Sequence, residues 1–132
     1  MNKILVEVSV GELLDKISIL EIKQEKIKDA ESLKFIEDEY KVLKSELDKN
    51  IKTDEKLKNL FNSLKEINSK LWVIEDDKRM CEKNKDFGEK FIKLSRDVHF
   101  LNDNRAKIKL EINNHTGSKI KEIKEYTKYS NG

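Results

Sequence analysis

No proline interrupts this chain of 132 residues, and it contains only four glycines. Proline and glycine are the residues that most often end a helix, so few positions can do so here. Apolar residues recur at spacings of three and four along most of the chain, which is the pattern of amphipathic helices. The sequence therefore predicts an all-α fold, and its length fits a single domain over residues 1–132.

Four long helices and a short one are predicted from the apolar stripes and from residues that favour helix ends. Ser9 and Asp86 each begin a capping-box sequence. Thr53 can cap the third helix, and Gly117 or Asn114 can close the fourth in a left-handed conformation. The expected helices cover about residues 10–28, 31–49, 54–83, 87–113 and 119–129.

A short β-strand is predicted over residues 3–8, where Ile4, Val6 and Val8 alternate with the residues between them. No second strand is evident, and a lone strand leaves its backbone hydrogen-bonding groups unpaired. We therefore expect this segment either to pair with the same segment of a second copy or to pack as an extended arm. The first arrangement is favoured.

The third helix keeps an apolar heptad pattern from Leu57 to Cys81, which is typical of coiled-coil packing. At about 1.5 Å per residue, the third and fourth helices would each be roughly 40–45 Å long. Short connections favour antiparallel neighbours. We expect an antiparallel helical bundle that includes a long helical hairpin, and its projecting ends favour a homodimer.

Composition excludes several classes of protein. The 28 basic residues nearly balance the 26 acidic ones, for a net charge of +2, which gives no case for binding nucleic acid. The longest apolar run is Ile4-Leu5-Val6, far too short to cross a membrane, and no signal peptide is recognisable. Cys81 is the single cysteine, so no internal disulfide is possible. We expect a cytoplasmic protein with no membrane partner.

One polar residue stands where the fourth helix should present an apolar one. Arg105 falls within the stripe of that helix, and it is one of three arginines in a chain whose other basic residues are lysine. A guanidinium in a low-dielectric interior requires a partner. Asn102 and Lys109 lie one turn away on either side, and Asp103 lies on the adjoining face.

Other helices offer partners for this arginine. The third helix carries a second stripe beside its apolar one, formed by Trp72, Glu75, Arg79 and Glu82. Neighbours within this stripe are one turn apart and can form ion pairs along the helix. On the first helix Glu21 borders the core, and Asp15 lies upstream of it. An antiparallel bundle could bring these groups to one layer.

Three interpretations of this polar cluster are possible. The favoured one is a set of buried ion pairs that fixes the register of the bundle. The second is a pocket for an anion or polar ligand, with Arg105, Lys109 and Arg79 as donors and Trp72 as a stacking wall. The third is a divalent metal site, whose ligands would be Glu21, Glu75, Asp76 and Glu82.

No recognised catalytic or metal-binding motif is present. The sequence has no Cys/His spacing of a zinc site, no glycine-rich phosphate loop and no nucleophile elbow. His99 is interpreted as a solvated helical side chain, and His115 as part of a turn rich in hydrogen-bonding groups. No catalytic residue is therefore assigned, and no metal or other cofactor is expected from the motifs.

Several blocks of the sequence resemble a small bacterial and phage family of unknown function. These blocks are VSVGELLDKISILEIK near the start, LWVIEDD in the middle, FIKLSRDVHFLNDNRA later and TGS near the end. The resemblance implies a helical fold and brings no activity. The residues that carry it include Glu21, Trp72, Glu75, Arg79, Asn102, Asp103 and Arg105.

The sequence favours a protein-interaction or scaffolding module that acts as a homo-oligomer. The alternative is a binder or Mg²⁺-dependent hydrolase of an anionic metabolite, such as a nucleotide or sugar phosphate. That alternative is weakened because the chain lacks two acidic pairs at helix-turn spacing on separate helices. Mg²⁺ is expected only under the alternative.

Overall fold

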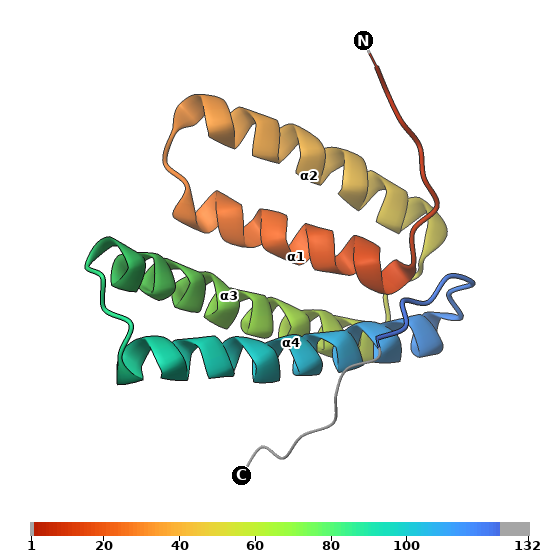
Figure 1. Ribbon diagram of the computed structural model, residues 1–132. Helices are drawn as coiled ribbons and strands as arrows, with labels where there is room; N and C mark the ends of the chain where they lie inside the picture. Colours follow the sequence, from red (N-terminus) through yellow and green to blue (C-terminus); the bar gives the residue numbers. More distant parts are fainter. Residues whose placement is uncertain (1, 125–132) are drawn as a thin grey trace.

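The computed structural model describes residues 2–124, and these residues form four helices joined by short connections (Figure 1). The bounds are α1 Val10–Lys26, α2 Ala30–Asn50, α3 Glu55–Lys83 and α4 Glu89–Thr116. The predicted all-α class is confirmed, and each of the four long helices lies within one turn of its expected range. None of these helices is long and apolar enough to span a membrane.

Helix α1 lies at the centre of the fold. It contacts α2, α3 and α4, and α3 contacts α4, whereas α2 has α1 as its only helical neighbour among the described residues. The α1–α2 hairpin therefore lies against the α3–α4 hairpin, and the far end of the longer hairpin extends past the end of α1 (Figure 1). The predicted antiparallel bundle with a long helical hairpin is the observed architecture.

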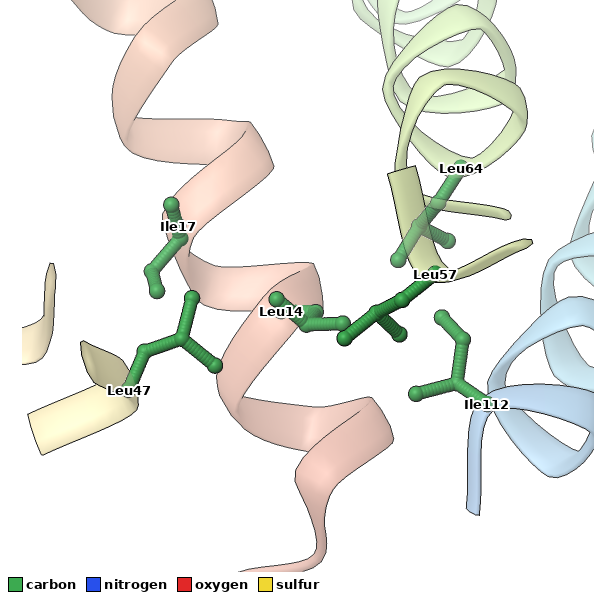
Figure 2. Close-up of a cluster of buried hydrophobic side chains, with 6 residues drawn as sticks. All are labelled: Leu14, Ile17, Leu47, Leu57, Leu64 and Ile112. Atoms are coloured by element: carbon green, nitrogen blue, oxygen red, sulfur yellow. The ribbon is translucent and has the colours of Figure 1, made fainter. Parts of the chain in front are cut away.

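The apolar core lies where the four helices meet (Figure 2). Its fully buried members are Leu14 and Ile17 of α1, Leu47 of α2, Leu57 and Leu64 of α3, and Ile112 of α4. Burying side chains of this size stabilises the fold by roughly 1.5–3 kcal/mol each. Because three helices surround it, α1 buries apolar side chains on more than one side, among them Leu14, Ile17, Leu20 and Ile22.

Two of the predicted helix ends are confirmed. The hydroxyl of Ser9 accepts a hydrogen bond from the backbone N–H of Glu12 at 3.0 Å, as an N-cap residue should. At the end of α4, Gly117 adopts the left-handed conformation with φ of 68°, which glycine tolerates best.

The other two helix starts differ from the prediction. Asp54, rather than Thr53, caps α3, because its carboxylate accepts the N–H of Leu57 at 2.8 Å. Helix α4 begins after Gly88, which makes no side-chain capping bond; the carboxylate of Asp86 accepts the N–H of Gly88 instead. For α3, the carboxylate of Asp54 lies one position nearer the helix than Thr53, so it reaches the free backbone amides of the first turn more easily.

Two predicted elements are not formed. Residues 3–8 are not a strand, because the described chain offers no second strand to pair with them. Residues 119–124 are not helical either, and the predicted residues 125–129 of that tail helix lie outside the described part of the chain. The left-handed Gly117 turns the chain back, and Ser118 bonds to the carbonyl of Ile120 rather than starting a helix.

Candidate functional site

Arg105 is paired with the carboxylate of Asp15. From α4 the guanidinium donates through Nε to Oδ1 of Asp15 at 3.0 Å and through Nη2 to Oδ2, a two-pronged geometry that an ammonium cannot make. The side chain of Asp15 is 2% exposed and that of Arg105 is 29% exposed. The hydrogen bonds that Arg105 donates to Asp15 raise the pKa of Arg105 against the effect of burial, so the guanidinium stays charged.

The third helix joins this pair through Asn68. Its side-chain amide donates to Oδ1 of Asp15 at 2.9 Å and to Oγ of Ser18 at 2.8 Å. The hydroxyl of Ser18 in turn donates to the backbone carbonyl of Asp15 at 2.7 Å. We call Asp15, Ser18, Asn68 and Arg105 the Asp15 cluster. It connects α1, α3 and α4 by hydrogen bonds.

Lys109 lies one turn further along α4 and is buried, with 8% of its surface exposed. Its ammonium lies 2.8 Å from a carboxylate oxygen of Glu12 and 2.9 Å from one of Glu122. Burial alone would lower the pKa of Lys109, but the two carboxylates raise it. Hydrogen bonds from Lys124 and Lys109 lower the pKa of Glu122 to about 2. The capping box predicted at Ser9 is thus only half formed, because Glu12 pairs with Lys109.

The first turn of α1 is bound by the last turn of α4. The side-chain oxygen of Asn113 accepts the N–H of Gly11 at 2.7 Å, and the hydroxyl of Ser118 accepts the N–H of Val10 at 3.2 Å. These amides have no partner within α1, so Asn113 of α4 and Ser118, just after the cap of α4, supply their acceptors. The helices approach closely here, because a Cβ on Gly11 would lie 2.6 Å from the carbonyl oxygen of Lys109.

Glu21 belongs to a separate, more exposed cluster. It accepts a hydrogen bond from Lys65 of α3 at 3.1 Å and one from the hydroxyl of Tyr40 of α2 at 3.4 Å. Lys65 also donates to Glu25 at 2.9 Å. Glu21 therefore faces α2 and α3, and it makes no contact with Arg105.

The predicted stripe of α3 is not bonded to Arg105 in the described part of the chain. Glu75, Arg79 and Glu82 are exposed and Trp72 is half-buried, and none of the described hydrogen bonds or ion pairs joins them to the Asp15 cluster. Arg105 and Asn68 bind the same carboxylate, that of Asp15, so they lie at the same position along the α3–α4 hairpin. Glu82 is then about four turns, or roughly 20 Å, further along α3. Asn102 and Asp103 lie half-buried on α4 beside Arg105.

Residues 4–131 match the model of a protein family described as a family of unknown function, DUF6165. The chain belongs to this family. Comparison with curated protein sequences and with solved structures gave no match. Membership in DUF6165 supports the sequence resemblance but brings no activity, so function has to be argued from the geometry.

Four polar residues of this DUF6165 protein were not singled out as site residues from the sequence. They are Asp15, which lies upstream of Glu21, and Ser18, Asn68 and Asn113. All four are buried, at 5% exposure or less. Asn68 follows Leu64 by one turn, on the buried side of α3, which is the one signal that could have found it.

His115 joins the end of α4 to the start of α3. Its Nε2 lies 2.8 and 3.0 Å from the two carboxylate oxygens of Asp54. The backbone N–H of Leu57 and then this histidine lower the pKa of Asp54. The histidine therefore contacts the carboxylate that caps α3, and this contact joins the end of α4 to the start of α3.

No metal site is formed by the described residues. None of their histidine, cysteine, aspartate and glutamate side chains gather in groups of three or more that could hold an ion. Glu21 lies in its own cluster with Lys65, while Glu75, Asp76 and Glu82 are exposed on α3. The arrangement thus adds no support to the Mg²⁺ version of the alternative function.

Proposed function

We propose that this DUF6165 protein is a protein-interaction module that associates with itself, with the dimer as its basic unit. The observation that carries the proposal is the exposure of residues 2–8, which we call the N-terminal arm. Ile4, Leu5 and Val6 are 85%, 83% and 73% exposed, and they are consecutive. Contiguous exposed apolar surface of this kind marks interaction sites in soluble proteins.

The outer surface of α2 supports the same proposal. Phe35 and Val42 are exposed large apolar side chains on α2, which contacts only α1 among the described helices. Other large apolar side chains are also exposed on the described body, including Phe87 and Ile92. A helical body with apolar side chains on its surface suits a module that binds other protein chains.

The geometry favours this proposal over a pocket for an anionic metabolite. Arg105 already holds Asp15 with two hydrogen bonds, and Lys109 already holds two carboxylates. Among the described residues, no buried side-chain nitrogen or oxygen lacks a hydrogen-bond partner. An anion would have to displace a carboxylate that is buried, which leaves an unpaired charge in the interior.

Molar mass in solution tests the proposal. Light scattering coupled to size-exclusion chromatography, or sedimentation equilibrium, should give a mass that rises with concentration towards twice the chain mass of 15.6 kDa. A variant lacking residues 2–8 should stay monomeric and keep its helicity and melting temperature, because the arm makes no hydrogen bond to the body. A wild-type protein that is monomeric at every concentration contradicts the proposal.

A further inference from the structure

The backbone of the N-terminal arm is free on both sides. Among the described residues, no hydrogen bond of any kind involves residues 2–8. The arm leaves the body at Ser9, the cap of α1, and runs past the end of α2 away from the helices (Figure 1). An extended segment with unpaired N–H and C=O groups is a template for pairing with another strand.

The side chains of the arm suit a β-strand. Ile4, Val6 and Val8 are β-branched and fall on one face, and such residues are enriched in strands. Lys3, Leu5 and Glu7 fall on the other face. The arm therefore carries one apolar face and one face with a charge at each end and a leucine between them.

Lys3 and Glu7, the two charged residues of the arm, each lie two positions from Leu5. If two arms pair antiparallel with Leu5 facing its own copy, Lys3 of each arm faces Glu7 of the other, and Ile4 faces Val6. Opposite charges that face one another across strands are favourable, and like charges are unfavourable. This pairing is self-complementary, as a two-fold symmetric interface requires.

Other pairings lose this match. Parallel pairing in register sets Lys3 against Lys3 and Glu7 against Glu7. An antiparallel shift that moves the symmetry point from Leu5 to Ile4 or Val6 sets a charged side chain against Leu5. A shift by one residue moves every side chain to the opposite face. The sequence of the arm thus specifies one register.

From these observations we infer that the N-terminal arms of two copies pair as an antiparallel two-stranded ribbon whose two-fold axis passes at Leu5. The inference rests on the proposed self-association and names the surface that mediates it. A two-stranded ribbon is marginally stable by itself. The dimer should therefore dissociate on dilution.

Charge reversal tests the register. Lys3→Glu alone sets glutamate against glutamate at both ends of the ribbon, and Glu7→Lys alone sets lysine against lysine. Each variant should weaken the dimer by about tenfold or more. An equimolar mixture of the two variants should form a heterodimer of wild-type affinity, because every glutamate then faces a lysine. The Lys3→Glu/Glu7→Lys double variant should restore the homodimer. Sedimentation velocity measures all four.

Cysteine cross-linking gives an independent measurement. Leu5→Cys places two thiols directly opposite one another and should form a covalent dimer under mild oxidation. Lys3→Cys is the matched control and should not, since each residue 3 faces residue 7 of the second copy. The native Cys81 is buried and does not compete.

The outcomes separate this inference from the proposed function. A wild-type dimer that neither charge reversal weakens overturns the ribbon and leaves self-association standing. Single variants that weaken the dimer but do not recover on mixing overturn the antiparallel register, as does cross-linking through residue 3 rather than residue 5. A wild-type protein that is never dimeric overturns both.

Discussion

Replacing Arg105 with methionine should destabilise the protein strongly. The variant leaves the carboxylate of Asp15, which is 2% exposed, with the amide of Asn68 as its only side-chain donor. Removing one member of a buried ion pair costs about 3–5 kcal/mol. Because Arg105 is itself 29% exposed, water already screens part of the pair, so we expect the lower end, about 3 kcal/mol.

A loss of this size is large against a total stability of about 5–15 kcal/mol. For a chain of this length it corresponds to a fall in melting temperature of about 10 °C. Urea unfolding followed by far-UV circular dichroism measures it, and the dependence of the unfolding free energy on urea should be unchanged. Scanning calorimetry gives the melting temperature independently.

Two further variants make the result specific to the ion pair. Arg79→Met is the same chemical change at an exposed position of α3, and it should alter stability by no more than about 0.5 kcal/mol. Asp15→Asn combined with Arg105→Met removes both charges and should recover much of the loss. The reasoning is refuted if Arg105→Met is as stable as the wild type, or if Arg79→Met loses as much.

Three other measurements test the region around α1. Gly11→Ala should cost about 1–3 kcal/mol, because its new methyl group meets the carbonyl of Lys109. Gly88→Ala should cost less, because its new methyl group meets only the carboxylate of Asp86, at an ordinary contact distance of 3.5 Å, and equal losses in urea unfolding would contradict the close approach at Gly11. The pKa of Glu122 is lowered to about 2, so its contact with Lys109 stabilises the fold above pH 4.5. This stabilisation is lost as the pH falls from about 4.5 towards 2. A carboxyl NMR titration of Glu122 with a midpoint near 4.5 would argue against this stabilisation. Nucleotides and sugar phosphates, with and without Mg²⁺, should leave the melting temperature unchanged, and a ligand shift that disappears in Arg105→Met would favour the metabolite-binding alternative.

The helices could be predicted because their signals are local. Each apolar stripe and each end signal lies within one short segment, as at Ser9 and Gly117, so no knowledge of neighbouring helices is needed. The strand prediction also used only a local pattern, but a strand requires a partner, and residues 2–124 supply none. The tail helix failed similarly, because Ser118 and Glu122 also bond to distant parts of the fold, Ser118 to Val10 and Glu122 to Lys109.

Arg105 could be identified from the sequence, whereas its partner could not. A charged residue in an apolar stripe is visible in a single helix. The identity of the partner depends on which helix is central and on the register between helices. The sequence suggested one buried face for α1, but α1 is enclosed by three helices, so Asp15 and Ser18 are buried as well. Small polar residues beside an apolar stripe look like surface positions until that enclosure is known.

The central position of α1 has a consequence for folding. Its buried polar groups bond to residues that are synthesised much later: Asp15 and Arg105 are 90 positions apart, and Gly11 and Asn113 are 102 apart. Contacts of such sequence separation slow folding, because a long loop must close before they form. On the ribosome, α1 can pair with α2 early, but the carboxylate of Asp15 and the first amides of α1 find their partners only after α4 has emerged. The first helix to be made is therefore among the last to reach its native environment.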